Sequence, residues 1–174
     1  MKNTFKRIFR PWTYERKMFI KDWAKTLPKG AKILVAGAGS CKYKPFFSHC
    51  DYKAQDFGAY DGEDHHIYGG LDYVSDITDI PVKNASFDYL MSTEVLEHLP
   101  RPDLALKEFS RILSTGGELI LTAPMRAGIH MAPYHFYGGF TRYWYEHFLP
   151  KYGFDIVSIQ ENGKFFRYYG AISQ

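Results

Sequence analysis

Two glycines that are one residue apart follow an apolar run near the start of this sequence. The run is Ile33–Ala36, and Gly37-Ala38-Gly39 comes directly after it. Glycines at the end of a strand let the backbone approach a ligand closely, because no Cβ stands in the way. A second short segment ends in Asp56, nineteen residues after Gly37, and its carboxylate can accept hydrogen bonds from ribose hydroxyls. This spacing favours a nucleotide-like ligand, although Gly-x-Gly also occurs in turns that bind nothing.

Histidines form a second group of candidate reactive residues. His130 and His135 lie in the Gly- and Pro-containing segment 125–137, and His98 follows the segment Glu94–Glu97. An imidazole exchanges a proton near neutral pH, so we expect these three residues to include a catalytic base. Local packing and hydrogen bonding are the alternative roles. His130 and His135 have no Cys or acidic neighbours to complete a zinc site, so the sequence predicts no metal.

The elements that must position these residues alternate along the chain. Apolar runs predict strands near 32–36, 52–56, 71–75, 86–92, 117–123 and 154–160. Helical spacing predicts helices near 43–49, 101–113 and 141–151. Gly116-Gly117 is expected to stop the second of these helices, and the glycines and polar residues of 57–70 predict a mobile loop. Such alternation is typical of an α/β fold with a doubly wound, mostly parallel, Rossmann-like sheet.

Length and composition fit a globular protein. The chain has 174 residues, enough for one domain with a real core, and 45% of them are hydrophobic. No apolar run approaches the roughly 18 residues that a membrane span needs. Cys41 and Cys50 are too few for a disulfide scaffold. We therefore expect a reducing, cytoplasmic location.

Positive charge is concentrated at the N-terminus. Residues 1–29 hold nine Lys or Arg and two acidic residues, a net charge of +7, while the whole chain carries +3. Within this segment Thr13 to Leu27 reads as an amphipathic helix, with an apolar face expected to contain Tyr14, Met18, Phe19, Trp23 and Leu27. We therefore divide the chain into a basic N-terminal segment, 1–29, and a domain, 30–174. The basic face is either an ordinary solvated surface or a surface for anions, including peripheral contact with the inner face of a membrane.

Four sequence blocks, in this order, resemble the class I S-adenosylmethionine-dependent methyltransferases, in particular the branch called methyltransferase type 11. The blocks are the glycine segment Ile33–Ser40, the acidic strand end Asp56, Ser75-Asp76-Ile77 with Ile80-Pro81, and Phe87–Leu99 leading into Glu108–Leu113 and Gly116–Pro124. The resemblance spans about Ala31 to Gly163. It implies S-adenosylmethionine as cofactor and methyl transfer to an oxygen or nitrogen of a small-molecule or sugar-like acceptor, including a lipid-linked saccharide.

The resemblance also implies which residues hold the cofactor. They are Gly37, Ala38, Gly39, Asp56, Phe57, Asp76, Ile77, Thr93 and Glu94. The glycine segment would pass under the methionine part, Asp56 would bind the ribose, and Asp76 would meet the adenine amino group, with Ile77 packing on the ring. Thr93-Glu94 would border the sulfonium. His98, His130 and His135 remain the candidates for the catalytic base, and the segment 125–137 resembles a substrate-side loop.

Three departures from the family pattern bear on activity. Val35 stands where the family has an acidic residue, and Cys41 replaces the third glycine. The eleven residues Lys164–Gln174 are too few for a further helix and a full strand, so we expect a sheet that can lack the family's final strand. These departures keep open a catalytically degenerate fold that acts as a binding or interaction module.

Two other classes fit the sequence less well. A nicotinamide-dependent dehydrogenase needs a third glycine where this chain has Lys42. A nucleic-acid methyltransferase would carry an Asn-Pro-Pro-Tyr-type block where Thr93-Glu94 stands, which argues against nucleic acid as a partner.

Overall fold

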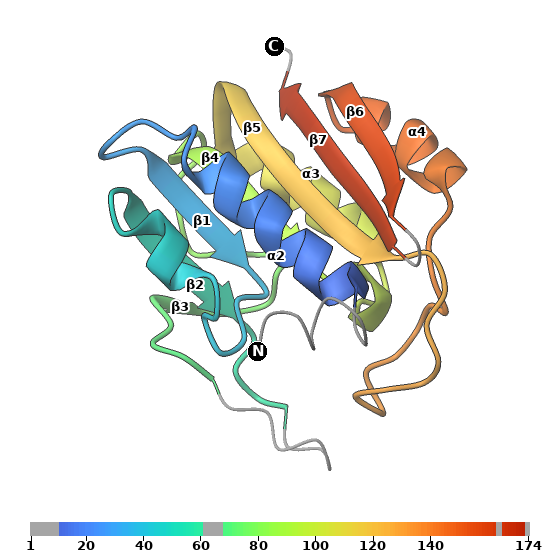
Figure 1. The fold of residues 1–174 in the computed structure, drawn as a ribbon. Coiled ribbons are helices and arrows are strands. Elements are labelled where there is room, and N and C mark those ends of the chain that lie inside the picture. Colours follow the sequence, from blue (N-terminus) through green and yellow to red (C-terminus); the bar gives the residue numbers. More distant parts are fainter. Residues whose placement is uncertain (1–10, 61–67, 163–164, 173–174) are drawn as a thin grey trace.

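The computed structural model describes residues 11–60, 68–162 and 165–172, and Figure 1 shows the fold. The helices are α2 (Pro11–Ala24), α3 (Pro102–Ile112) and α4 (Arg142–Lys151), with the short 3-10 helices η1 (Lys44–Phe47) and η2 (Leu96–His98). The strands are β1 (Lys32–Ala36), β2 (Asp51–Asp56), β3 (Tyr73–Val74), β4 (Phe87–Thr93), β5 (Leu113–Pro124), β6 (Phe154–Asn162) and β7 (Phe165–Ile172). Residues 1–10 of the basic segment and 61–67 of the predicted loop lie outside the described residues.

The strands of the described ranges form one sheet in the order β3-β2-β1-β4-β5-β7-β6. Neighbours from β3 to β5 are parallel, whereas β7 runs antiparallel to both β5 and β6. Chain order runs outward from β1 in two directions, so the sheet is doubly wound as the sequence predicts. The carboxyl ends of the parallel strands consequently meet at one edge of the sheet.

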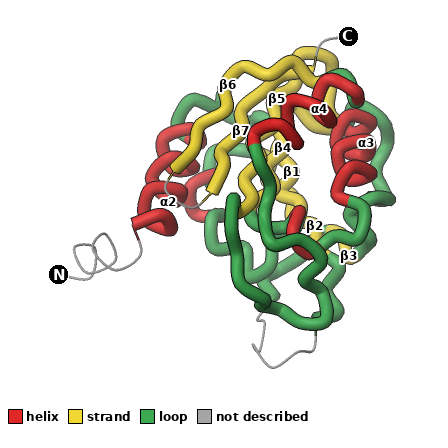
Figure 2. Tube along the Cα trace, turned by 90° about the vertical axis from the view of Figure 1, so that its right-hand side faces the viewer, coloured by secondary structure: helices red, strands yellow, loops and turns green. Residues whose placement is uncertain are grey.

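Helices cover both faces of the sheet, because successive strand residues point to opposite sides. Figures 1 and 2 place α2 on one face and α3 and α4 on the other. Ile20 and Trp23 of α2 pack with Ile33 and Val35 of β1 in one buried cluster. On the opposite face Phe109 of α3 packs in a second cluster, which includes the alternate β1 residues Leu34 and Ala36. No helix in the described ranges is both long enough and apolar enough to cross a membrane.

The expectation that the sheet can lack its final strand is wrong. Strand β7 fills the position between β5 and β6 and pairs with β5 from Glu118↔Ala171 to Pro124↔Phe165. Only residues 163–164 separate β6 from β7. A hairpin needs no intervening helix, and so a short C-terminal segment is sufficient to complete the sheet.

Three other elements differ from their predicted form. The expected helix over 43–49 is the four-residue 3-10 helix η1, with a proline in its first turn. The expected strand over 71–75 contains only Tyr73 and Val74. Helix α3 ends at Ile112 and β5 begins at the next residue, so Gly116-Gly117 does not stop the helix; Gly116 has a φ of 75° within the strand.

An acid and a base on α3 fix the segment that precedes β4. The buried carboxylate of Glu108 accepts a hydrogen bond from the Ile80 backbone N–H at 2.7 Å. Arg111 pairs with Glu108 at 2.6 Å and donates to the carbonyl oxygens of Ile80 and Val82 at 3.0 and 2.8 Å. These contacts hold the chain just after Asp76 and Ile77, and thereby position two of the predicted site residues.

Replacing Glu108 with alanine tests this anchor. We expect Glu108→Ala to lower the free energy of unfolding by about 1.5–3 kcal/mol, the range for hydrogen bonds to a charged group, despite the higher helix propensity of alanine. Lys107→Ala, at the adjacent exposed position of the same helix, should change it by less than about 0.5 kcal/mol. Urea denaturation measures both, and equal effects would contradict an anchoring role.

Candidate functional site

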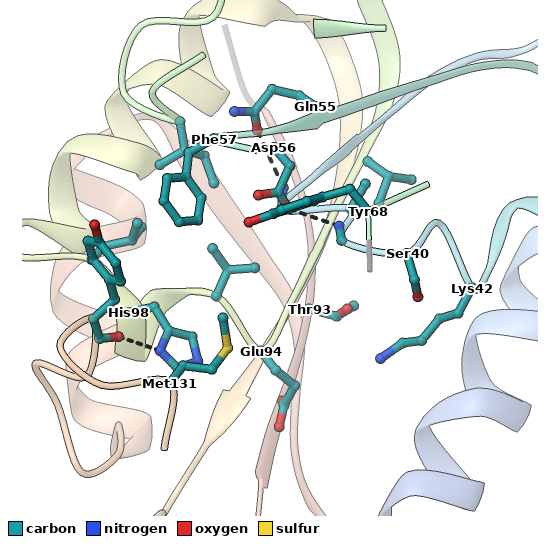
Figure 3. A pocket seen from close by; sticks show the side chains of 18 of the residues that line it. Ser40, Lys42, Gln55, Asp56, Phe57, Tyr68, Thr93, Glu94, His98 and Met131 are labelled. Carbon is teal, nitrogen blue, oxygen red and sulfur yellow. Dashed lines mark hydrogen bonds between the residues drawn. The ribbon is translucent and has the colours of Figure 1, made fainter. Parts of the chain in front are cut away.

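A cavity of about 520 Å³ opens at the carboxyl ends of β1, β2 and β4. This is the point at which the strand order reverses, because β1 lies between β2 and β4. Open α/β sheets bind ligands in the crevice at this point, and the volume lies in the range for small-molecule sites. All nine residues predicted for the cofactor line the cavity, as do His98 and His130, whereas His135 is not among the lining residues. Figure 3 shows the cavity from close by.

The floor of the cavity is the turn that follows β1. Gly37 and Gly39 have φ values of 71° and 52°, a region that favours glycine. A Cβ added to Gly37 would overlap the side chain of Val95. The turns after β1 and β4 are therefore so close that only glycine fits at position 37. The Gly39 N–H donates to Asp56 Oδ2 at 2.8 Å, which joins the ends of β1 and β2.

Asp56 and Asp76 mark one corner of the cavity. Asp56 is buried, and its second oxygen, Oδ1, lies 3.4 Å from the Gly58 N–H. Asp76 uses Oδ1 to accept hydrogen bonds from the N–H and hydroxyl of Thr78 at 2.8 and 2.7 Å. Ile77, which follows it, is buried. The corner thus combines two carboxylates with an apolar surface, a combination that suits a ribose and a planar base.

A second corner contains two cations and a carboxylate. Arg16 of α2 is 7% exposed, and its Nη1 lies 2.7 Å from Glu94 Oε2. Glu94 Oε1 also accepts a hydrogen bond from the Thr122 hydroxyl at 3.0 Å. Lys42, which is exposed, lines the same corner, where partial desolvation and the nearby Arg16 charge lower its pKa. Figure 3 shows Lys42 on the side opposite His98, with Glu94 between them. A ligand carboxylate would find complementary charge there.

The histidines form the third corner. The ring centroids of His98 and His130 are 4.7 Å apart, and those of His130 and His135 are also 4.7 Å apart. His98 Nδ1 lies 2.6 Å from the Tyr134 carbonyl oxygen, and His130 Nδ1 lies 2.9 Å from that of Gly128. Burial, with the adjacent His130, lowers the pKa of His135. The structure therefore brings together three residues that the sequence could only name separately.

Glu97 lies beside this corner and supports it. Its backbone carbonyl accepts hydrogen bonds from the N–H groups of Phe136 and Tyr137, at 2.9 and 3.2 Å, and so attaches the loop after β5 to η2. Its side chain is 1% exposed, and Oε1 lies 3.7 Å from His98 Nε2. Burial, together with the Glu94 charge, raises the pKa of Glu97 to about 8, so the carboxyl is mainly protonated at neutral pH.

Sequence reasoning missed Arg16 because the predicted apolar face of this helix was only partly right: Trp23 and Leu27 are buried as expected. Tyr14, Met18 and Phe19, expected on the packed face, are only half-buried. The buried positions are Arg16, Ile20, Trp23, Ala24 and Leu27. Their spacing of three and four residues is helical, so a face drawn through Ile20 and Trp23 would have included Arg16. Part of the basic segment thus belongs to the cavity rather than to the outer surface.

Two of the three departures from the family pattern, Val35 and Cys41, are accommodated locally. Cys41 has a φ of 54°, the left-handed conformation that a glycine would adopt, and its Sγ lies 3.9 and 3.8 Å from the carbonyl oxygens of Gly39 and Gly70. Val35 is 4% exposed and packs among the apolar residues under α2. Neither residue closes the cavity.

Sequence comparison identifies a family over part of the chain. Residues 52–121 match the family described as "Methyltransferase domain". A sarcosine/dimethylglycine N-methyltransferase from Halorhodospira halochloris is 35% identical over 63 residues, which are 33% of this chain and 23% of that protein. The match therefore spans about a quarter of the length of this relative.

Structure comparison finds the same fold in solved proteins. A SAM-dependent methyltransferase from Aquifex aeolicus superposes with a TM-score of 0.66 at 16% identity, over 90% of this chain and 89% of that one. The [4+2]-cyclase SpnF superposes with a TM-score of 0.68 at 15% identity, over 92% and 82%. At these identities the superpositions establish the architecture alone.

The close approach at Gly37 gives a prediction with an internal control. Gly37→Ala places a side chain in the left-handed region and against Val95, so we expect a loss of about 1–2 kcal/mol for the conformation and about 1–3 kcal/mol more for overpacking. Gly30→Ala, at a φ of 80° with nothing near the added Cβ, should show only the first loss. Denaturation midpoints measure both losses.

The double variant Gly37→Ala/Val95→Ala completes this experiment. Shortening Val95 should recover part of the overpacking loss while the conformational loss remains. A Gly37→Ala variant no less stable than Gly30→Ala would contradict the close approach.

Proposed function

We propose that the chain is a class I S-adenosylmethionine-dependent methyltransferase and that it transfers the methyl group of S-adenosylmethionine to a small-molecule acceptor. The cofactor supplies an activated methyl group on a sulfonium. The task of the protein is then to hold that group in line with an acceptor atom and to exclude water, and positioning of this kind is worth about 7–11 kcal/mol in favourable cases.

The arrangement of the three corners around one cavity carries this proposal. The carboxylates of Asp56 and Asp76 suit the ribose and adenine. The charges of Arg16, Lys42 and Glu94 suit a zwitterionic amino acid: the cations attract its carboxylate and Glu94 attracts its ammonium. The glycine turn between these corners leaves room for the chain that links them. The residues present therefore fit S-adenosylmethionine along its whole length.

The acceptor is assigned to the histidine corner. His98 and His130 line the cavity there, with Met131, Tyr134 and Phe136 beside them. We propose that an imidazole of this corner accepts the proton of a hydroxyl or ammonium acceptor. General base catalysis of this kind raises the rate by about 10²–10⁴-fold. An amine acceptor would parallel the sarcosine/dimethylglycine relative. A sugar hydroxyl is the other acceptor class that a polar, aromatic corner suits.

A methyltransferase fold without methyl transfer is the competing proposal. The superposition on the [4+2]-cyclase SpnF makes it specific, because that protein has the same architecture and is named for another activity. Val35 and Cys41 are the residues of this chain that motivate it. Under this alternative the cavity would bind S-adenosylmethionine and no methyl group would leave it.

Contact with an anionic membrane surface is a further part of the proposal for partners and location. Lys17 and Lys21 of α2 and Lys25, directly after it, are exposed, while Arg16 of the same helix is buried. The outward lysines would attract anionic lipid headgroups by about 1 kcal/mol each. A cytoplasmic enzyme that acts on a lipid-linked saccharide would gain local substrate concentration from such contact.

Calorimetry and turnover together test the proposed function. S-adenosylhomocysteine should bind with one-to-one stoichiometry, and methyl-labelled S-adenosylmethionine should pass its label to members of an acceptor panel of small amines and sugars. Binding without transfer to any member would favour the degenerate alternative. Absence of binding by a folded chain would contradict both proposals.

Asp56 gives the sharpest test of the ribose position. We expect Asp56→Ala to weaken S-adenosylhomocysteine binding by about 10- to 150-fold, which corresponds to about 1.5–3 kcal/mol for hydrogen bonds to a charged group. Asp51→Ala, at the exposed opposite end of the same strand, is the matched control and should bind normally. An unchanged dissociation constant in a variant with a native circular dichroism spectrum would rule out the ribose role.

Arg16 tests the amino-acid corner through a pair of ligands. Arg16→Met should weaken S-adenosylhomocysteine binding by at least about tenfold, and adenosine, which lacks the amino-acid part, should bind as it does to the parent chain. Lys17→Met changes the neighbouring exposed charge and should leave both ligands unaffected. Equal losses for the two ligands would show that Arg16 maintains the cavity as a whole and does not recognise the carboxylate.

A further inference from the structure

The histidine corner has a property that methyl transfer by itself does not require. One candidate ligand nitrogen from each of His98, His130 and His135 lies within 4.8 Å of the others. His98 comes from η2, and the other two come from the loop between β5 and α4. Three imidazoles that converge from two segments form a donor set of the kind that transition metals bind.

Hydrogen bonds orient two of these rings as metal ligands are usually oriented. A carbonyl oxygen can only accept, so the Nδ1 atoms of His98 and His130 carry the hydrogens in their contacts with Tyr134 and Gly128. In a neutral imidazole this leaves Nε2 with the lone pair. Metal-bound histidines commonly donate their second ring N–H to a backbone carbonyl in this way, which fixes the tautomer and the ring orientation.

The third ring, that of His135, has a buried nitrogen. Among the described residues, His135 Nδ1 is buried and has no hydrogen-bond partner. A buried polar atom without a partner is costly, so it points to an interaction that protein groups do not supply. Coordination of a metal through Nδ1 would satisfy this atom.

The backbone around the cluster holds it together at two points. Glu97 O binds the N–H groups of Phe136 and Tyr137, next to His135, and Glu97 itself precedes His98. Tyr134 O binds His98 in return. Tetrahedral zinc with Zn–N distances of about 2.0–2.1 Å separates its ligand nitrogens by about 3.3–3.4 Å. The three histidine nitrogens must therefore move closer together to bind zinc. The loop that carries His130 and His135 has no helix or strand between Pro124 and Arg142, so small adjustments of the loop and of the side chains can bring them to this separation.

We propose that His98, His130 and His135 bind one divalent transition-metal ion, with zinc as the representative, at the acceptor end of the cavity. Three protein ligands leave the fourth tetrahedral position open, as in catalytic rather than structural zinc sites. Since His98 and His130 line the cavity, that position faces the space assigned to the acceptor. If the proposed methyl transfer also holds, the metal would take the place of a free imidazole base: it would bind an acceptor oxygen or nitrogen, favour loss of its proton and orient it toward the methyl group.

Metal titration of the untagged full chain tests the site without any need for turnover. Zinc chloride should bind with one-to-one stoichiometry in calorimetry, and Co²⁺ should develop the visible absorption of a tetrahedral site. Three single variants remove one proposed ligand each: His98→Ala, His130→Ala and His135→Ala. Each should weaken zinc binding by at least about tenfold, because even the loss of a residue that only hydrogen-bonds to a metal ligand has an effect of this size. His147→Ala removes an exposed histidine of α4 and should leave the affinity unchanged.

A measurement on the parent chain guards against variants that fail to fold. In long-range ¹H–¹⁵N spectra, zinc should shift the side-chain signals of three histidines and leave the others, including His147, in place. Absence of stoichiometric zinc binding, or equal affinity in the parent chain and the triple alanine variant, would overturn the proposal. S-adenosylhomocysteine binding to chelator-treated protein reports on the proposed function separately, so either can fail alone.

Discussion

The ligand-binding edge of this molecule depends on one close approach, that of the turn after β1 to the turn after β4. Gly37 leaves the space that Val95 fills. Gly39 reaches Asp56 at the end of β2, and Glu94 reaches Thr122 of β5. Four strand ends are thus linked through backbone turns that adopt positive φ at Gly37, Gly39 and Glu94. The positions of the polar side chains follow from this packing, because each lies within two residues of a turn that cannot move independently.

What the sequence predicts well is the part of the site that strand ends determine. Asp56 and Thr93 terminate β2 and β4, and an apolar run followed by a polar residue is a local signal that needs no knowledge of the rest of the chain. The family match covers this part of the chain, residues 52–121. The final strand was not predictable on the same basis. Strand β7 follows a two-residue connection and takes its place between β5 and β6 by long-range pairing, which no local pattern records.

Contacts between distant segments explain the other differences. Arg16 acquires its role only because α2 lies across β1, and its partner Glu94 belongs to a turn far along the sequence. The histidines are similar: the spacing of His130 and His135 in an irregular loop fixes no distance, and the hydrogen bonds to Glu97 O bring that loop to His98. In each case the residue types were visible in the sequence, whereas the geometry that makes them a group required the tertiary structure.

Helix α2 packs on Val35, the position at which the family has an acidic residue, and it also places the charged side chain of Arg16 in the cavity. Val35 packs with Ile20 and Trp23 of α2, where a carboxylate would be buried among apolar side chains at a cost of several kcal/mol, in rough terms, unless it were paired. The same helix carries Arg16 into the cavity, where it pairs with Glu94. A carboxylate thus borders the site from β4 rather than from β1, with a cation from α2 to neutralise it. Position 35 is therefore apolar in a site that still has a carboxylate, which Glu94 supplies.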